Sequence, residues 1–579
     1  MKRCSVSYLR NIAGVCVFLA ICVTIIVLCL TLGRPPKDQR RTFITGEDML
    51  DYLKLQGVID SKDGLLVSWS HGANNKSQME EALKSDIMVL EADVNVEGYG
   101  TKNQTNIPIM AHPPAVYSDN TLQEWLDTVV VSSKGIKLDF KSIEAVSPSL
   151  NILNAKASKG QIRQPIWLNA DIVIGPNVNH NIAVNASQFL GLIQTKFPDV
   201  TISPGWVTLY LPPILSNRTY SWEMIQEMYN LVKSLPQRVT FPARAVLTRS
   251  AWQHFHWLLQ QSERYTLTLW QGSSDPLTLE DLLFIRDNSH PEQIYYDIYE
   301  PLLSDFKQIA LNPHRKRLFY SGGNLELYFH PDDDDGLWVE WFDAEGNITY
   351  VESILNGNSG MITFQVEMRD INSSVIAAVV LSGSDTVQSL ETVLKLVSDH
   401  FSPWGVFLRI SDHASLNETL RILRDQSKQR ALYFPVWINM DVSYGSFSVP
   451  GYIDGKDFIN SINNIFPFVT IAPGWPAEVL GQGYTDQIAQ DMLKLCKGLW
   501  QEVSFQLQAV ALGVAWDGAI KLKNTSSIYS LTVQHDGPPE KFMDGYKGLM
   551  TIRSHTENKV YYKLTHDDRI SFLYSVYTS

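Results

Sequence analysis

The stretch from Val67 to Lys141 decides the fold. It reads VSWSHGANN at 67–75, IMVLEADV at 87–94, IPIMAHPP at 107–114 and IKLDFK at 136–141. Each segment is rich in strand-forming residues and carries groups that can hold a cation or move a proton. These groups are His71, Glu91 with Asp93, His112, and Asp139 with Lys141. Because the loops that follow parallel strands share one face of an α/β barrel, we expect these side chains to converge on one site.

Strand-like and helix-like runs alternate beyond this stretch, as parallel βαβ units require. About eight strands over roughly 250 residues suit a TIM-like barrel. The expected helices are 77–85, 121–130, 186–197 and 219–235. The expected strands are 87–94, 135–140, 162–173, 200–206, 239–247, 265–272 and 293–299.

An internal repeat doubles this fold. QPIWLNADIV at 164–173 recurs as FPVWINMDVS at 434–443, and FPDVTISPGW at 197–206 recurs as FPFVTIAPGW at 466–475. We therefore predict two tandem TIM-barrel-like domains of the PLC-like phosphodiesterase type, at 61–315 and 316–579. The second is expected to open with a β-rich, turn-rich insert at 317–342.

The second copy has lost the charged groups of the first. At an offset of 270 residues, Ser382, Phe407, Arg409 and Ser411 stand where His112, Lys137, Asp139 and Lys141 stand in the first copy. No Glu-x-Asp pair and no counterpart of His71 is evident there. A cluster needed only for folding should persist in both copies, so its loss favours a functional role in the first and a degenerate site in the second.

The N-terminus contains an unbroken apolar run at 12–32. A helix of that length crosses a bilayer, so we expect a transmembrane signal anchor, with 1–11 as a cytoplasmic tail and 33–60 as a juxtamembrane spacer. A cleaved signal peptide is the alternative. Glycosylation sequons begin at Asn75, Asn103, Asn185, Asn217, Asn347, Asn372, Asn417 and Asn524. They favour a single-pass type II membrane protein with most of the chain extracellular or lumenal.

Net charge and the positions of the cysteines limit the partners of the chain and the interactions that stabilise its domains. A net charge of -13 argues against nucleic acid as the main partner. Four of the five cysteines lie in the tail or the apolar run, which leaves Cys496 outside. The domains must therefore rest on hydrophobic cores, with Cys496 either a buried helix residue or a dimer-forming thiol.

The acidic residues carry the strongest chemical signal. Glu91, Asp93 and Asp139 supply the hard oxygen ligands that Mg²⁺ or Ca²⁺ prefers, although acids at strand ends are also common on solvated surfaces. His71 and His112 suit acid/base transfer because imidazole titrates near neutral pH; a hydrogen-bonded structural histidine is the alternative. Lys141 could neutralise developing phosphate charge or simply be solvated.

These residues resemble those of a known family. His-x-x-Asn, Glu-x-Asp, a strand-end His and an acid-x-Lys strand are the pattern of glycerophosphodiester phosphodiesterases and the related sphingomyelinase-D-like phospholipases. Over nearly the whole region after the spacer, including the WLNAD and ISPGW blocks, the chain is similar to the menorin family, in a tandem form behind a membrane anchor. That family is grouped with the same barrels.

The resemblance implies roles for individual residues. Glu91, Asp93 and Asp139 would hold the metal, His71 and His112 would be the acid/base pair, and Lys141 would stabilise phosphate charge. Substrate-binding positions would be Asn74, Arg244, Asn169 and Trp206. The usual His-Arg-Gly opening is here His-Gly-Ala-Asn, so Arg244 would have to replace the missing arginine. Asn169 and Trp206 recur in the second copy as Asn439 and Trp475, which also fits a structural role.

Two functions remain open on this basis. One is a metal-dependent phosphodiesterase, a hydrolase or lyase, that acts on glycerophosphodiester- or lysophospholipid-type substrates. The other is a non-catalytic cell-surface binding protein that uses an inactive barrel to engage extracellular protein partners.

Overall fold

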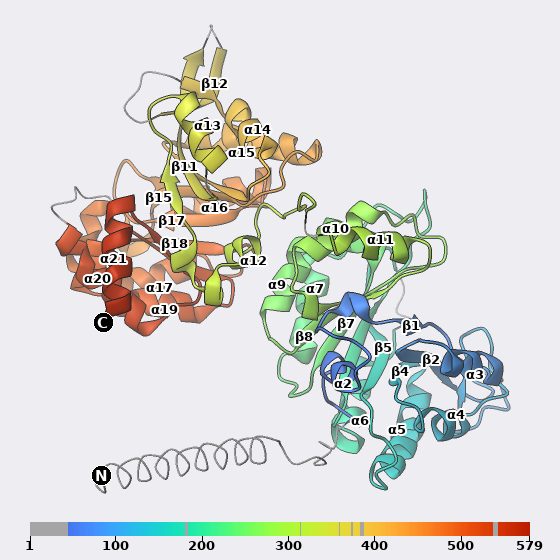
Figure 1. Ribbon diagram of the computed structural model, residues 1–579. Helices are drawn as coiled ribbons and strands as arrows, with labels where there is room; N and C mark the ends of the chain where they lie inside the picture. The colour runs from blue at the N-terminus through green and yellow to red at the C-terminus, as the bar shows by residue number, and fades with distance from the viewer. Residues whose placement is uncertain are drawn as a thin grey trace, which may run out of the picture. The chain divides into compact units, whose positions relative to one another are not determined.

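The computed structural model describes residues 45–578, apart from 180–182, 313, 358, 372–373, 382–386 and 536–541. Two sheets of mainly parallel strands are each surrounded by helices (Figure 1). The prediction of two tandem TIM-barrel-like α/β domains is confirmed. The tail and membrane span expected at 1–11 and 12–32 lie outside the described residues. No helix in the described part of the chain is long and apolar enough to cross a membrane.

The first barrel contains eight parallel strands that neighbour one another in chain order. They are β1 (Trp69–Ser70), β2 (Val89–Val96), β4 (Gly135–Phe140), β5 (Ile166–Ile174), β6 (Thr201–Val207), β7 (Val239–Arg244), β8 (Tyr265–Trp270) and β9 (Ile294–Asp297). A short strand, β3 (Pro108–Met110), runs antiparallel to β2. The surrounding helices are α3 (Lys76–Lys84), α4 (Leu122–Val129), α5 (Ile143–Ala157), α6 (Ala186–Lys196), α7 (Trp222–Val232), α8 (Ala245–Thr248), α9 (Trp252–Gln260), α10 (Leu279–Asp287) and α11 (Leu302–Ala310).

Residues 45–60, expected to belong to the spacer 33–60, pack onto the first barrel. Asp48 precedes helix α2 (Met49–Leu55), and its carboxylate accepts hydrogen bonds from the amides of Leu50 and Asp51 in the first turn. Its buried side chains are Met49, Leu50, Tyr52 and Leu53. Just before the helix, the carbonyl of Thr45 accepts a hydrogen bond of 2.8 Å from the amide of Ile166 at the start of β5. The barrel domain therefore begins near Thr45.

A tight turn before β1 packs the start of the barrel against β9. The 3₁₀ turn η1 (Gly64–Leu66) approaches β9 so closely that a Cβ on Gly64 would lie 2.0 Å from the carbonyl oxygen of Ile294. Asp63 caps this turn and forms a two-pronged ion pair with Arg286 of α10, at 2.6 and 2.5 Å. This turn joins the first and last strands of the barrel.

The second barrel repeats the order of eight parallel strands. They are β10 (Trp341–Asp343), β11 (Gly360–Ile371), β14 (Trp404–Ile410), β15 (Val436–Ser443), β17 (Thr470–Gly474), β18 (Val503–Gln508), β19 (Tyr529–Gln534) and β20 (Val560–Lys563). The strands outside this order are β12 (Ser374–Val380) and β13 (Val387–Ser389), which extend the sheet antiparallel beside β11, and β16 (Ile453–Asp454). The helices are α12 (Leu325–Phe329), α13 (Ile348–Gly357), α14 (Leu390–Asp399), α15 (His413–Lys428), α16 (Gly455–Ile465), α17 (Asp486–Leu495), α18 (Ala509–Val514), α19 (Asp517–Thr525), α20 (Phe542–His555) and α21 (His566–Thr578).

The opening of the second barrel copies that of the first. DGLLVSW at 63–69 recurs as DGLWVEW at 335–341. Asp335 caps a 3₁₀ turn, η5 (Gly336–Trp338), and pairs with Arg553 at 2.7 and 2.6 Å. A Cβ on Gly336 would lie 2.2 Å from the carbonyl oxygen of Val560. The prediction of a β-rich insert at 317–342 is wrong, because this segment holds α12, short turns and the start of β10.

Cys496, which directly follows α17, is fully buried. Burial raises the pKa of its thiol to about 12, so it behaves as a small core residue.

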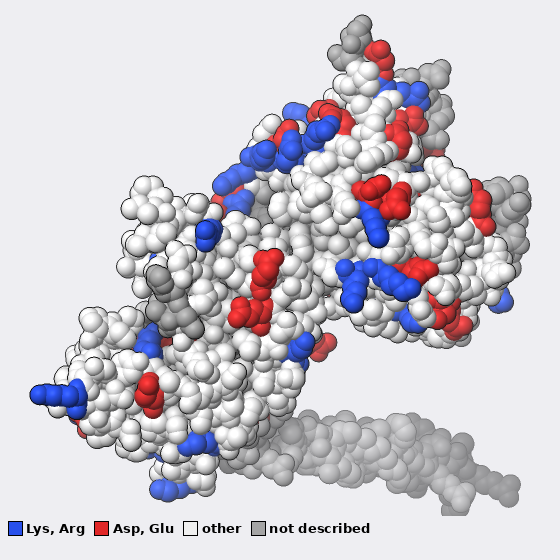
Figure 2. Space-filling model, turned by 180° about the vertical axis from the view of Figure 1, so that it is seen from behind, with Lys and Arg blue, Asp and Glu red and all other residues white. Residues whose placement is uncertain are grey.

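The surface carries charges of both signs. On the face shown in Figure 2, Lys and Arg side chains are interspersed with Asp and Glu and with wide uncharged areas. The charge on that face is therefore mixed.

Candidate functional site

A buried ion pair lies inside the first barrel. Glu91 on β2 is the register partner of Lys137 on β4. The Nζ atom of Lys137 lies 2.8 Å from Oε1 of Glu91, and each side chain is only 4% exposed. The same ammonium group lies 5.9 Å from the ring centre of Trp69. Both charged groups are therefore buried inside the barrel, between β2 and β4.

Neighbouring charges keep this pair ionised despite burial. Burial works to raise the pKa of Glu91, but Lys137 and His71 outweigh it and hold the pKa of Glu91 well below its usual range. Burial works to lower the pKa of Lys137, but Glu91 outweighs it and raises the pKa of Lys137 above its usual value. The barrel therefore contains a true ion pair.

His71 brings Glu91 together with a carboxylate from the last strand. Its Nδ1 lies 2.9 Å from Oε2 of Glu91 and 3.0 Å from Oδ2 of Asp297, the residue that ends β9. The ligand atoms of these three residues lie within 4.8 Å of one another. In the described ranges this is the one group of three His, Cys, Asp or Glu side chains with such spacing.

One hydrogen on Nδ1 of His71 faces two carboxylate oxygens. Nδ1 carries at most one hydrogen, and Oδ2 of Asp297 and the buried Oε2 of Glu91 lie 3.0 and 2.9 Å from it. Two carboxylates at one place in a barrel are costly to bury unless a cation meets both. The donor set of one imidazole nitrogen and two carboxylates fits a divalent ion.

Without such an ion, a proton on His71 supplies the positive charge. The two carboxylates beside its Nδ1, Asp297 first and then Glu91, raise the pKa of His71 to about 11. His71 is therefore an imidazolium at neutral pH in this arrangement. A cation that binds to Nδ1 would have to displace that proton.

A second cluster joins the ends of β2 and β4. Asn74 donates to Oδ2 of Asp93 at 2.8 Å and accepts from the Asp93 amide at 2.7 Å. The Nζ atom of Lys141 lies 3.0 Å from Asp93 and 2.5 Å from Asp139. Burial works to lower the pKa of Lys141, but Asp139 and Asp93 outweigh it and raise the pKa well above the usual value. Asn169 donates to Asp139 at 2.7 Å.

The structure therefore divides the three carboxylates expected to hold one metal. Glu91 faces His71 and Asp297, whereas Asp93 and Asp139 are bridged by Lys141. Asp297 lies in the expected strand 293–299 but was not singled out as a site residue. Its place at the end of the last parallel strand is the signal that could have identified it.

Asp171 is a further acid at this end of the barrel. It lies at the barrel opening, where solvent reaches part of the side chain. The surrounding protein removes much of the water from its carboxylate, and this desolvation, followed by the negative charge of Asp139, raises the pKa of Asp171 to about 7. A Cβ on Gly205 would lie 2.2 Å from its Oδ1, which explains the glycine of the SPGW block. Asp441 and Gly474 repeat this contact at 2.0 Å in the second barrel.

His112 reaches this end of the barrel by an antiparallel return. The amide of Ala111, which follows β3, donates to the carbonyl of Asp93 at 2.9 Å, so the next residue, His112, lies beside the acidic strand end. The side chain is exposed, and its Nδ1 lies 2.6 Å from the carbonyl of Pro113. A carbonyl can only accept, so Nδ1 carries the hydrogen and Nε2 is left for proton transfer.

Two expected substrate-binding residues have other partners. Arg244 ends β7, three residues before the end of the expected strand 239–247, and pairs with the buried Asp275 at 2.8 and 2.6 Å. Its guanidinium also lies 5.2 Å from the ring centre of Trp270. Trp206 is 1% exposed and packs edge-on against Tyr220 at 5.3 Å. Neither makes a contact with His71 or the acids that surround it among the interactions of the described residues.

Both halves of the chain match one protein family. Residues 63–303 and 335–569 match the Menorin N-terminal domain. The chain belongs to the menorin family. The human Protein FAM151B is 46% identical to this menorin over 262 residues, which are 45% of this chain and 93% of that protein.

The second barrel of this menorin keeps the fold without the buried ion pair. By strand register, Thr363 and Phe407 take the positions of Glu91 and Lys137. Phe407 packs against Trp341 at 5.7 Å between ring centres, in an apolar cluster that includes Trp437. A hydrophobic layer thus fills the space that the first barrel gives to charges.

This comparison predicts how the ion pair responds to substitution. Lys137→Phe alone should lower the free energy of unfolding of the first barrel by about 3–5 kcal/mol, because Glu91 is left buried and unpaired. The double variant Glu91→Thr/Lys137→Phe, which copies the second barrel, should recover most of that loss. Urea unfolding of the full chain, followed by tryptophan fluorescence, measures both. A harmless single change, or a double variant no more stable than the single one, would contradict this account.

Proposed function

We propose that this menorin is a membrane-anchored, metal-dependent phosphodiesterase whose active site lies at the strand ends of the first barrel. The observation that carries the proposal is the group of His71, Glu91 and Asp297, whose ligand atoms all lie within 4.8 Å of one another. A stability role alone does not account for these charges, because the second barrel folds with Thr363 and Phe407 in place of Glu91 and Lys137.

His71, Glu91 and Asp297 are the proposed ligands of the divalent ion. Mg²⁺ or Ca²⁺ suits the carboxylates, and an imidazole ligand also suits Mn²⁺. The bound ion would supply Lewis-acid polarisation of a phosphoryl oxygen. Asp93 and Asp139, expected as ligands from the sequence, instead hold Lys141 in position.

The remaining residues of the site have complementary roles in the proposal. Lys141 keeps its positive charge and can stabilise charge that develops on phosphate oxygens. Nε2 of His112 can take or give a proton, and Asp171, with a pKa of about 7, can serve as its counterpart. Asn74 orients Asp93, and Asn169 orients Asp139.

Glycerophosphodiester- or lysophospholipid-type substrates fit the surroundings of this site. The segment after β6 leaves the same end of the barrel and exposes apolar side chains, with Leu211 56% and Ile214 82% exposed. Exposed apolar side chains beside a site favour a substrate with an acyl chain. A membrane anchor at 12–32, as the sequence predicts, would keep the site near such substrates.

Assays of the full chain with added Mg²⁺, Ca²⁺ or Mn²⁺ test this proposal. Glu91→Gln, Asp297→Asn and His71→Asn should each lower kcat/KM for glycerophosphodiester or lysophospholipid hydrolysis by at least about 10²-fold, and chelation should do the same reversibly. Asp343→Asn, at the position of His71 in the second barrel, is the matched control and should retain activity.

The contrary result favours the rival function. If no phosphodiester is turned over and no divalent ion binds, or if Glu91→Gln is fully active, the catalytic proposal fails. A non-catalytic cell-surface protein that engages extracellular proteins through the same barrel would then be the better reading.

An extracellular or lumenal location is part of the proposal. Of the seven sequon asparagines in the described residues, six are exposed and Asn417 is half-buried. Treatment of the chain from secretory-pathway membranes with an N-glycosidase should increase its mobility on a gel. Substitution of the exposed Asn103 and Asn524 by Gln should give part of the same shift. A chain that carries no glycan and runs on the gel at the mass of its 579 residues alone would contradict this location.

A further inference from the structure

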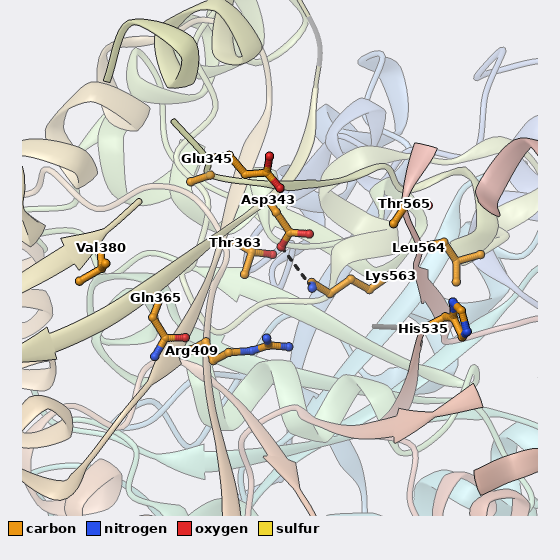
Figure 3. Close-up of a pocket in the computed structure, with 11 residues that line it drawn as sticks. Asp343, Glu345, Thr363, Gln365, Val380, Arg409, His535, Lys563, Leu564 and Thr565 are labelled. Atoms are coloured by element: carbon orange, nitrogen blue, oxygen red, sulfur yellow. Dashed lines mark ion pairs between the residues drawn. The ribbon is translucent and has the colours of Figure 1, made fainter. Parts of the chain in front are cut away.

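The strand ends of the second barrel enclose two adjoining cavities. One has a volume of about 550 Å³, and Figure 3 shows polar side chains from several strands around it. The other has a volume of about 730 Å³, and Gln365 and Arg409 border both spaces. These volumes lie in the range of roughly 300–1,000 Å³ that small-molecule sites occupy. The C-terminal strand ends are also where barrels of this type bind their ligands.

Thr363 on β11 carries a buried hydroxyl group that no hydrogen bond satisfies. The residue is 7% exposed and borders the smaller cavity. Its Oγ1 has no hydrogen-bond partner among the described residues. A buried hydroxyl in this state destabilises the fold, because the group has lost its water and gained nothing in exchange. A ligand in the cavity that exchanges a hydrogen bond with Oγ1 would offset this loss.

Asn439 has lost a hydrogen bond that its counterpart in the first barrel keeps. There the hydroxyl of Ser203 donates to the amide oxygen of Asn169 at 2.6 Å. By strand register, Ala472 stands beside Asn439 where Ser203 stands beside Asn169, and the alanine side chain cannot donate. Asn439 is 6% exposed and borders the larger cavity. A ligand hydroxyl in that cavity would replace the missing serine.

Charged groups of both signs border the cavities. The larger one is lined by one cation and four carboxylates: Arg409, Asp412, Asp441, Asp454 and Asp457. At the smaller one Lys563 lies 3.2 Å from Asp343, an ion pair that the dashed line in Figure 3 marks. The four carboxylates disfavour an anionic ligand, and the arginine among them disfavours a strongly cationic one.

Neither a metal ion nor an organic cation has the surroundings that it requires. Among the described residues, the one group of three His, Cys, Asp or Glu side chains with the spacing of metal ligands lies in the first barrel. Organic cations are recognised by several aromatic faces. Of the described residues that line the two cavities, Tyr452 is the one Phe, Tyr or Trp. A neutral polar ligand therefore fits these surroundings best.

We propose that the strand ends of the second barrel bind a neutral carbohydrate. A sugar hydroxyl both donates and accepts hydrogen bonds, so neighbouring hydroxyls of one molecule can satisfy Thr363 and replace the donor that Asn439 has lost. The side-chain amide of Gln365, which borders both cavities, can likewise donate and accept. The carboxylates of the larger cavity accept from further hydroxyls. This binding requires no metal ion, so it is independent of the site proposed in the first barrel.

A microarray of immobilised glycans, probed with the full chain, tests this proposal. The chain is kept in EDTA and in a detergent without a sugar headgroup. We expect binding to at least one neutral oligosaccharide, and calorimetric titration with that sugar gives the affinity. Thr363→Val and Gln365→Met should each weaken it at least fivefold. Thr525→Val, on the exposed side of α19, is the matched control and should leave it unchanged.

The melting temperature of the Thr363→Val chain without sugar is the second measurement. Valine keeps the shape of threonine and removes the unsatisfied hydroxyl, so the variant should melt at or above the temperature of the unaltered chain. A loss of binding in this variant then reports on the ligand contact and not on folding. The bound glycan, presented on a lipid in phosphatidylcholine vesicles or as the free oligosaccharide, distinguishes a glycolipid from a soluble or protein-linked glycan as its source.

Three outcomes would overturn the proposal. They are the absence of binding to every neutral glycan, binding confined to sulfated or sialylated glycans or to spermidine, and binding that both variants retain at full strength. Because EDTA removes divalent ions from the first barrel, failure of the catalytic proposal would not alter this result.

Discussion

A lysine and a glutamate inside a barrel can remain only as a charged pair, and the first barrel depends on this constraint. Lys137 and Glu91 are almost fully buried and 2.8 Å apart. A buried ion pair rarely stabilises a fold more than well-packed apolar side chains do. The second barrel uses Phe407 and Thr363 at the same two positions. The pair therefore makes sense as a means of holding Glu91 ionised and in place.

The contact between the first and last strands of each barrel supports different roles for the two barrels. In the first barrel His71 contacts Asp297, and in the second Asp343 contacts Lys563, so the acid and the base have exchanged places. Either ion pair can join the first strand to the last. Among the described residues, the first barrel alone places a further carboxylate, Glu91, within reach of that pair. The first barrel thus has the donors of a cation site, and the second has Thr363 and Lys563 at the positions of Glu91 and Asp297.

Much of this architecture could be predicted from the sequence, because period and repeat are local signals. The strand at 135–140 and the helix at 186–197 lie within one residue of β4 and α6. The repeat DGLLVSW and DGLWVEW was also readable and would have aligned Asp343 with His71. The partners of the site were not readable in this way. Asp297 contacts His71 only because the last strand of the barrel lies beside the first. Lys141 forms ion pairs with both Asp93 and Asp139 only because the register of β2 and β4 places these residues together.

The central claim is that His71, Glu91 and Asp297 together hold a divalent ion. A crystal of the full chain grown with Mn²⁺ and measured for anomalous scattering tests it most directly. The account predicts one strong peak in the first barrel, about 2.0–2.3 Å from Nδ1 of His71, Oε2 of Glu91 and Oδ2 of Asp297. A peak between Asp93 and Asp139 instead, or none in the first barrel with His71 still bridging both carboxylates, would contradict it.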